Sequence, residues 1–441
     1  SGKQDAYDKS CYRCNDRIKK NQPSDHRPAR GKGRFYMKPG INNYSEIGKL
    51  NKVLLHRIGD EIEGLVPDNF ERLLFDDIPY LKVAQQEHDK FADVLRENDV
   101  EVIYYVDETV KALRDRKVRE RFVKEFVSES DIHSDAVKEA LEEYLMSMSV
   151  KDMVEKTISG VKKSELSVKS TSLADYISSG YPYYTDPMPN LYFTRDQGAC
   201  VGDGVSIHRM STAARRREAL LLKYMFRYDS SFAPEGTNIW YDYDQAYSME
   251  GGDVLVLSDE IVAIGLSQRT TVAGIEQFAR NILNKSSFRK ILVFDIPKCR
   301  AFMHLDTVFT MVDFDKFTIH PEIEGPLQLF EITLDREGNA HFSSIQDELA
   351  NILKNELGLP AVDLIRCGGD DAQAAQREQW NDGSNTLAIA PGVVVTYERN
   401  YVTNDLLDKK GIKVLTIPSS ELSRGRGGPR CMSCPVNRED L

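Results

Sequence analysis

The sequence has few cysteines and no long apolar run. Seven of its 441 residues are cysteine, an odd and sparse set that is unlike the disulfide framework of a secreted protein. No apolar stretch reaches the roughly 18 residues needed to span a bilayer. The first residues, Ser1-Gly2-Lys3-Gln4, lack the apolar segment of a secretory signal. These absences predict a cytoplasmic protein in a reducing compartment, with no membrane partner.

Positive charge is also scarce. The chain has 58 Lys and Arg against 69 Asp and Glu, a formal net charge of -11. An acidic balance argues against broad nucleic-acid binding. The hydrophobic fraction of 41% is ordinary for a globular protein, and the length allows about two or three domains.

The N-terminal stretch differs in composition from the rest of the chain. Residues 1–36 are polar, mixed in charge and poor in aliphatic side chains, and we expect a disordered leader or a non-native extension there. Cys11 and Cys14 are half of a zinc-knuckle pattern. No second Cys or His pair follows at a suitable spacing, so no metal site is predicted.

From residue 37 the pattern indicates an α/β fold. A buried strand at 53–57, a helix at 80–97 and a strand at 100–106 follow one another. Residues 108–178 then change character, because they are rich in Lys, Glu, Arg, Leu and Ala and hold no Pro. We expect a helical insertion domain here, between the start of a catalytic domain (37–107) and its remainder (179–441). Its helices are expected at about 108–127, 134–147, 150–158 and 172–178.

After residue 185 a module recurs in which two strands precede a helix and a third strand. It is expected at 254–257, 261–266, 271–284 and 291–296, again at 328–334, 340–344, 345–357 and 362–366, and again at 386–390, 392–398, 401–409 and 413–418. Repeated ββαβ units of this size predict a pseudo-symmetric ring of similar modules.

The stretch from Ser423 to Cys434 combines arginine, glycine and cysteine. Arg424, Arg426 and Arg430 surround three glycines and lead into Cys431. Positive charge lowers the pKa of a thiol, so the pattern suits a nucleophile on a shaped loop. A flexible tail with an incidental thiol would look the same.

Other polar groups gather at the expected ends of elements. They are Asn190 to Asp196, Arg215 to Arg217, Glu250-Gly251-Gly252-Asp253, Gln268-Arg269-Thr270 and His304-Leu305-Asp306-Thr307. If His304 and Asp306 lie on a strand, both face the same side. Taken singly, each cluster has a structural interpretation as a turn, an ion pair, a solvated helix start or a core histidine. Together, a thiol, a histidine and several carboxylates suit nucleophilic attack on a cationic carbon, because two carboxylates can bind a planar guanidinium.

Four motifs in this order carry a resemblance to a known family. Phe-Thr-Arg-Asp (193–196), Glu-Gly-Gly-Asp (250–253), His-Leu-Asp-Thr (304–307) and Arg-Gly-Arg-Gly-Gly-Pro-Arg-Cys-Met (424–432) closely resemble bacterial-type arginine deiminases, and the likeness covers about residues 37–441. It implies a five-bladed α/β propeller of ββαβ modules with an inserted helical domain. It also implies hydrolysis of L-arginine to L-citrulline and ammonia without cofactor or metal. The helical insertion itself leads us to expect self-association into a homo-oligomer.

The resemblance assigns catalytic roles by position. Cys431 would attack the guanidinium carbon and form a covalent thiouronium intermediate. His304 would protonate the departing ammonia and then activate water, while Glu250 would orient His304. Asp196 and Asp306 would hold the guanidinium nitrogens.

It also assigns substrate-binding roles. Arg215, Arg269 and Asn190 would bind the α-carboxylate, Phe193 would pack on the aliphatic stem, and Arg426 would reach the substrate from a mobile loop and act partly as a gate. Asp253 would support the residues of the site without contacting the substrate itself.

The sequence departs from the family pattern at three places, and two other functions are also compatible with it. Gln197-Gly198 stands where many relatives have Pro-Phe, Arg430 is His in some, and Cys434 replaces a common Met. Cys431 and Cys434 form a C-x-x-C pair, and one hypothesis is that it oxidises and switches the enzyme off. The alternatives are a related hydrolase or amidinotransferase and an inactive scaffold.

Overall fold

The structure is a computed structural model that describes residues 40–441 apart from 169–172, 174–179, 300–301 and 326–327. All described residues belong to one compact unit, Lys38–Leu441. The leader expected at 1–36, with Cys11 and Cys14, lies outside the described residues, and so does nearly all of the helix expected at 172–178.

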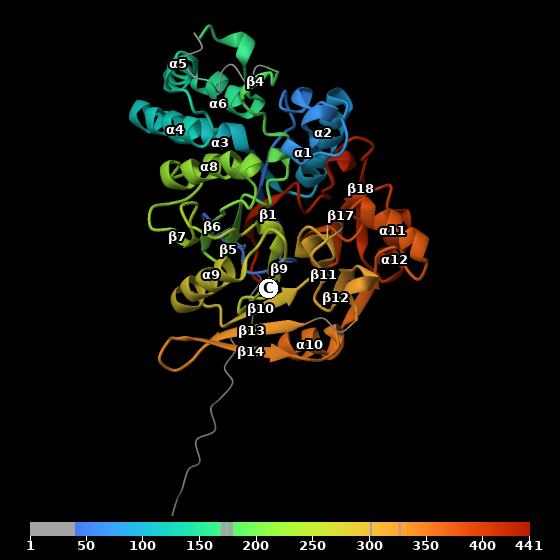
Figure 1. Ribbon diagram of the computed structural model, residues 1–441. Coiled ribbons are helices and arrows are strands. Elements are labelled where there is room, and N and C mark those ends of the chain that lie inside the picture. Colours follow the sequence, from blue (N-terminus) through green and yellow to red (C-terminus); the bar gives the residue numbers. More distant parts are fainter. Residues whose placement is uncertain (1–39, 169–172, 174–179, 300–301, 326–327) are drawn as a thin grey trace, which may run out of the picture. The chain divides into compact units, whose positions relative to one another are not determined.

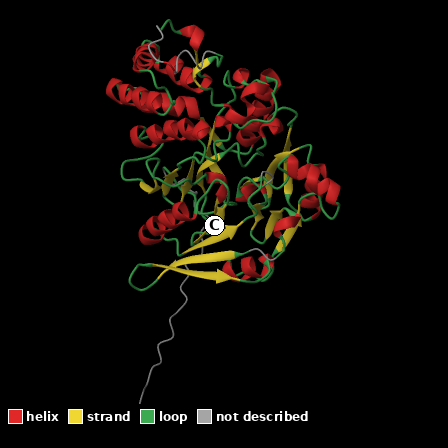
Figure 2. Ribbon diagram, viewed as in Figure 1, coloured by secondary structure: helices red, strands yellow, loops and turns green. Residues whose placement is uncertain are grey.

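Strands and helices alternate along this unit (Figure 2). The strands are β1 (Leu50–Leu55), β2 (Glu101–Tyr104), β3 (Val161–Lys162), β4 (Tyr183–Thr185), β5 (Gly198–Val201), β6 (Gly204–Ile207), β7 (Asn238–Tyr241), β8 (Val254–Val256), β9 (Ile261–Leu266), β10 (Lys290–Asp295), β11 (Phe309–Asp313), β12 (Lys316–Ile319), β13 (Leu329–Leu334), β14 (Ala340–Ile345), β15 (Asp363–Arg366), β16 (Leu387–Ala390), β17 (Val393–Tyr397), β18 (Lys413–Ile417) and β19 (Cys434–Arg438). The α-helices are α1 (Phe70–Leu73), α2 (Leu81–Glu97), α3 (Tyr105–Ala112), α4 (Arg116–Ser128), α5 (Asp135–Met146), α6 (Val150–Ser159), α8 (Ala213–Tyr228), α9 (Val272–Lys285), α10 (Leu349–Glu356), α11 (Ala372–Trp380) and α12 (Tyr401–Lys409). The α/β class expected from the sequence is confirmed.

One pairing pattern recurs among the described strands. In five groups a middle strand pairs antiparallel with one neighbour and parallel with the other: β19-β1-β2, β5-β6-β7, β8-β9-β10, β11-β12-β15 and β16-β17-β18. The parallel pair requires a crossover, and each crossover contains a helix. The middle strand β9 is apolar throughout and almost wholly buried, as a strand covered on both faces must be.

The prediction of the second ββαβ module is wrong, because its strands belong to two different sheets. The β13–β14 hairpin does not open a new sheet, because β13 pairs antiparallel with β10 and extends the β8–β10 sheet. The strand at the end of that module, β15, pairs instead with β12, which pairs with β11. The sequence interpretation overlooked β11 and β12, two short strands joined by a tight turn, and took the inserted hairpin in their place.

Helices α3 to α6 lie together beside α8 at one end of the unit (Figure 1). The helices expected at 134–147 and 150–158 are confirmed as α5 and α6. The single helix expected at 108–127 is wrong, because α3 ends at Ala112 and α4 begins at Arg116. Asp115 caps α4 by accepting hydrogen bonds from the backbone N–H groups of Lys117 and Val118, which fixes the break.

The described helices include none that is long and apolar enough to cross a membrane.

Candidate active site

Cys431 lies three residues before the start of β19 and is held through its own backbone groups. Its N–H donates to Oδ1 of Asn385 at 3.0 Å, and its carbonyl accepts from the N–H of Arg195 at 3.1 Å. The thiol is nearly buried, and Sγ lies 3.7 Å from Oδ2 of Asp306. Because β19 begins at Cys434 and pairs with β1 from that residue on, Cys431 is fixed just before an edge strand of a sheet.

The glycines before Cys431 allow the loop to lie directly on two aromatic rings. A Cβ at Gly425 would overlap the hydroxyl of Tyr192, and one at Gly427 would overlap the ring of Phe193. Between these glycines, Arg426 has a left-handed backbone with φ of 64°. The loop is therefore packed against the site at this point.

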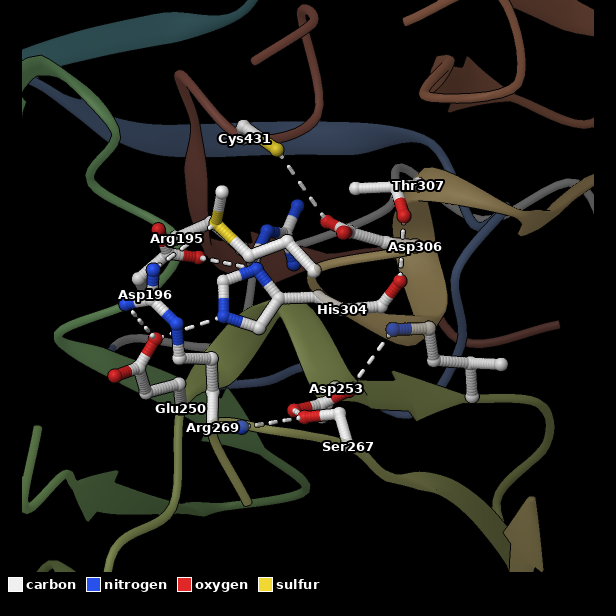
Figure 3. A network of polar contacts seen from close by, with 12 residues as sticks. Arg195, Asp196, Glu250, Asp253, Ser267, Arg269, His304, Asp306, Thr307 and Cys431 are labelled. Atoms are coloured by element: carbon white, nitrogen blue, oxygen red, sulfur yellow. Dashed lines mark hydrogen bonds and ion pairs between the residues drawn. The ribbon is translucent and has the colours of Figure 1, made fainter. Parts of the chain in front are cut away.

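His304 is buried between two carboxylates (Figure 3). Its Nε2 lies 2.8 Å from Oε2 of Glu250, and its Nδ1 lies 3.8 Å from Oδ1 of Asp196. Burial alone would lower the pKa of His304, but the carboxylates of Asp196, Glu250 and Asp253 outweigh burial and raise it to about 9. The imidazole is therefore cationic at neutral pH.

Glu250 is fixed from several sides. Its Oε1 accepts from the backbone N–H and the hydroxyl of Ser211 at 3.0 and 2.9 Å. Burial would raise the pKa of Glu250, but Arg269, His304 and Arg215 hold it well below its usual range. A carboxylate that stays ionised can orient His304 and stabilise its cationic form.

His304 and Asp306 do not lie on a strand. His304 has an extended backbone and precedes a short 3-10 helix that spans Leu305–Thr307. Asp253 accepts from the N–H of Leu305 at 2.9 Å and from the hydroxyls of Ser267 and Thr270. Asp253 thus fixes the backbone at the start of the Leu305–Thr307 helix. Burial raises the pKa of Asp253 to about 6.

Asp306 lies between the thiol and a buried arginine. Nη1 of Arg430 donates to Oδ2 of Asp306 at 2.7 Å, its Nε donates to Glu46 at 3.1 Å, and its Nη2 donates to the carbonyl of Val254 at 2.8 Å. Oδ1 of Asp306 is buried without a hydrogen-bond partner among the described residues. The Asp306 carboxylate is therefore fixed on one side and has a vacant acceptor.

Asp196 has the same two-sided arrangement. Nη1 of Arg215 donates to its Oδ2 at 2.7 Å, while within the described part of the chain Oδ1 accepts no hydrogen bond. Arg215 also donates to Glu218 and to the carbonyl of Asn190, so it is fixed as well. The side chain of Asn190 donates to the carbonyl of Leu73.

The expectation that neighbouring arginines lower the pKa of the nucleophile is wrong for the unliganded chain. Burial raises the pKa of Cys431 well above its usual value, and Asp306, Asp196 and Asp382 raise it further, against a smaller opposing effect of Arg430. Arg430 is paired with carboxylates, and Arg424 pairs with Asp77 and Glu421. The thiol is therefore protonated without substrate.

A cavity of about 510 Å³ opens onto the thiol. The predicted site residues that line it are Asn190, Phe193, Asp196, Arg215, Arg269, His304, Arg426 and Cys431. Glu250 and Asp306 lie behind this lining, where they contact His304 and Cys431, and Asp253 holds the N–H of Leu305, the residue after His304. The structure thus brings all eleven predicted residues to one place.

Several residues of the site were not predicted. Arg430 was noted only as a departure beside the nucleophile, and its partner Glu46 was not singled out as a site residue. Asn385 holds both the N–H of Cys431 and, through its Nδ2, the carbonyl of Asp306. Met303 and Asp76 line the cavity. A buried charge next to a candidate nucleophile was the signal that could have drawn attention to Arg430.

Cys434 contacts a different cysteine from the one expected. Its Sγ lies 3.7 Å from the carbonyl of Gly198, and its thiol shares a hydrogen bond with Cys200. No disulfide joins Cys431 and Cys434 in the structure. The C-x-x-C spacing therefore does not by itself identify the closest thiol partner. In the described part of the chain, no group of three His, Cys, Asp or Glu side chains is arranged to hold a metal ion.

The fold has a counterpart among solved structures. The amidinotransferase SxtG from Microseira wollei matches with a TM-score of 0.51 at 15% identity, over 91% of this chain and 98% of that one. This likeness shows that the chain and that amidinotransferase share one class of α/β fold.

Sequence comparison narrows the class to one family. The family model for arginine deiminase matches residues 71–438. The arginine deiminase of Clostridium perfringens is 53% identical over 408 residues, which are 91% of this chain and 98% of that protein. The arginine deiminase of Latilactobacillus sakei is 52% identical over 405 residues, again 91% and 98%. The chain belongs to the arginine deiminase family.

Proposed function

We propose that this protein hydrolyses L-arginine to L-citrulline and ammonia through a covalent intermediate on Cys431. As the substrate cation binds, the Cys431 thiol gives its proton to solvent and the thiolate attacks the guanidinium carbon. The carbon–nitrogen bond then breaks, and ammonia leaves with a proton from His304. Water attacks the resulting thiouronium carbon and gives one proton to His304; the carbon–sulfur bond breaks, and the remaining hydroxyl proton passes to the leaving thiolate, which releases citrulline and restores the thiol.

The observation that carries this proposal is the pair of buried carboxylate oxygens beside the thiol that accept no hydrogen bond from the described residues. Oδ1 of Asp196 and Oδ1 of Asp306 are both buried without a hydrogen-bond partner among the described residues. Unpaired buried acceptors are costly, and a guanidinium supplies planar donors that satisfy two carboxylates at once. The bound cation also stabilises a neighbouring thiolate, so the substrate itself lowers the high pKa of Cys431.

The other cavity residues bind the amino-acid end of the substrate. Each terminal nitrogen of Arg215 carries two hydrogens, so it can hold Asp196 and a substrate carboxylate together. Nη1 of Arg269 is buried without a hydrogen-bond partner in the described residues and is available to the same carboxylate. Asn190 and Arg426 add polar contacts, and Phe193 packs on the aliphatic stem.

The first test is product analysis with purified protein. L-Arginine should give citrulline and ammonia in equal amounts, and agmatine, which lacks the carboxylate, should react at least about 100-fold more slowly. Ornithine formation that requires an added amine would instead identify an amidinotransferase. If the folded protein turns over no guanidino compound, the proposal fails.

The raised pKa of His304 gives a pH prediction. If cationic His304 is the acid, kcat/KM for arginine should fall as pH rises through about 9. Glu250→Gln removes a carboxylate that stabilises the cation, so the pKa of His304 falls and the alkaline limb moves to lower pH. Glu331→Gln, which removes a carboxylate paired with Lys290, should leave the limb in place. An unmoved limb in Glu250→Gln would contradict the assignment.

The architecture and assembly are part of the same proposal. The five strand groups with one pairing pattern support a five-bladed propeller built from residues 37–107 and 179–441. The helices α3 to α6 support an inserted helical domain at 108–178. The protein acts in the cytoplasm as a homo-oligomer.

A further inference from the structure

A buried glutamate next to the site takes no part in the proposed reaction. Glu218 lies on α8 and is 1% exposed. Its Oε2 accepts a hydrogen bond from Nε of Arg215 at 3.0 Å and another from Nε2 of Gln197 at 2.7 Å. Among the described residues that line the catalytic cavity, Arg215 is present and Glu218 is not. Glu218 is therefore placed to affect a substrate through Arg215.

The Glu218 carboxylate fixes the orientation of the Arg215 guanidinium. While Nε of Arg215 donates to Glu218, Nη1 donates to Asp196 at 2.7 Å and Nη2 donates to the carbonyl of Asn190 at 3.3 Å. A guanidinium is a rigid planar fork, so a partner on Nε sets the direction of both terminal nitrogens. These nitrogens contact Asp196 and, in the proposed function, the substrate carboxylate.

Gln197 supplies the second contact that fixes Glu218. The Gln197 side chain is fully buried, and its Oε1 has no hydrogen-bond partner among the described residues. An unpaired buried acceptor is costly, so the bond from Nε2 to Glu218 is the contact that this burial serves. Gln197 directly follows Asp196 and is one of the positions at which the sequence departs from the family pattern. It is therefore a polar contact specific to this chain.

Ionisable side chains face Glu218 from the segment before β5, from α3 and from α8 itself: Asp196, Tyr105, Arg215 and Arg217. Burial raises the pKa of Glu218, as does the charge of Asp196, whereas Arg215 and the hydrogen bond from Gln197 lower it. The resulting pKa is about 7. The charge of Glu218 at neutral pH therefore depends on each of its hydrogen bonds.

We propose that Gln197 is a positioning residue for the reaction, because its hydrogen bond keeps Glu218 ionised and ionised Glu218 fixes Arg215 for the substrate carboxylate. This role rests on the proposed function, which assigns Arg215 to the substrate. A hydrogen bond to an ionised carboxylate is about twice as strong as one between neutral groups. When Glu218 takes up a proton, the guanidinium is therefore held less firmly at Nε. Gln197 thus sets the lowest pH at which the substrate carboxylate is bound well.

The test compares the pH dependence of kcat/KM for L-arginine in the wild type and in Gln197→Met, which keeps the length of the side chain and removes its donor. In the wild type kcat/KM should fall as pH drops through about 7. Loss of one hydrogen bond to a charged group should move this acidic limb to higher pH by about one to two pH units. At pH 7 kcat/KM should then be about 5- to 50-fold lower, mainly through KM, because the carboxylate contact is unchanged during the reaction.

The variant Glu218→Gln separates the charge of Glu218 from its packing. A carboxamide does not titrate, so the limb near pH 7 should be absent, and adding Gln197→Met should move the pH profile no further. A structural role of Gln197 alone would lower activity equally at every pH. The proposal is overturned if the limb keeps its midpoint in Gln197→Met or persists in Glu218→Gln.

The matched control is Gln277→Met. Gln277 lies on α9, donates to Oε1 of Gln245 at 2.7 Å and is not among the described residues that line the catalytic cavity. This variant should leave both KM and the midpoint of the limb unchanged. An equal shift in Gln277→Met would show that the limb reports general stability.

Binding without turnover gives a second readout. In the Cys431→Ala background, calorimetric titration with L-arginine at pH 6, 7 and 8.5 should show the dissociation constant rising at higher pH in Gln197→Met than with Gln197 present. Equal pH dependence in both proteins would refute the role of Gln197. Absence of citrulline from the wild type would instead refute the proposed function.

Discussion

Cys431→Ala is expected to form no measurable citrulline, with kcat at least about 10⁴-fold below that of the wild type, because the covalent route has no other nucleophile. Binding should survive, since the vacant oxygens of Asp196 and Asp306 that hold the guanidinium remain. Citrulline release from saturating L-arginine, together with calorimetric binding of L-arginine to the variant, measures both quantities.

The control is a second buried cysteine three positions along the chain. Cys434 contacts Gly198 and Cys200 rather than the cavity, so Cys434→Ala should retain activity within a few-fold. If Cys431→Ala still forms citrulline at a comparable rate, Cys431 is not the nucleophile. A loss in Cys434→Ala as deep as in Cys431→Ala would show that the assay reports folding instead of chemistry.

The chemical groups of the site could be identified from the sequence because each belongs to a short polar segment between apolar elements. The sequence alone could not show that these groups lie together. Asp196, Glu250, His304 and Cys431 come from separate modules and meet only in the folded chain. The resemblance to a family supplied that step. The residues fixing the site's geometry were harder to find, because Glu46 and Asn385 act through contacts with residues distant in sequence.

Two predictions from the sequence, the activated thiol and the module that contains the β13–β14 hairpin, were wrong for the same physical reason. Arg430 is adjacent to Cys431 in sequence, which suggested an activated thiol, but Glu46 and Asp306 offset its charge across long sequence separations. The β13–β14 hairpin was assigned to the wrong module because its partner strand is distant in sequence. In the structure Ile332 of β13 pairs with Ile291 of β10. Local patterns predict strands and helices, whereas strand partners and charge compensation depend on tertiary packing.

Arg430→Met is expected to lower the free energy of unfolding by about 3–5 kcal/mol at pH 7 and to abolish most activity. Arg430 is 1% exposed, and its removal leaves Glu46 and Asp306 as buried carboxylates without their partner. Asp306 also loses the contact that fixes it beside the thiol. Denaturant unfolding and citrulline release measure the two effects.

Arg366→Met is the matched control, since Arg366 also pairs with two carboxylates, Glu324 and Asp370, but is 45% exposed. Exposed pairs contribute about 0–1 kcal/mol, so this variant should unfold nearly like the wild type. Adding Glu46→Gln to Arg430→Met should recover part of the lost stability, because one buried charge is removed with its partner.

The pH dependence distinguishes loss of charge compensation from loss of packing. Burial raises the pKa of Glu46, but Arg430 and Arg195 outweigh burial and lower it to about 2. A carboxyl whose folded pKa is depressed stabilises the protein above its unfolded pKa, near 4.5, and this stability is lost as pH falls toward 2. Without Arg430 less of the effect of burial is offset, so the folded pKa of Glu46 rises from about 2 and ionised Glu46 contributes less stability to the variant at neutral pH. The stability difference between wild type and Arg430→Met should therefore narrow below about pH 4.5, whereas a difference constant with pH would show that Arg430 acts through packing alone.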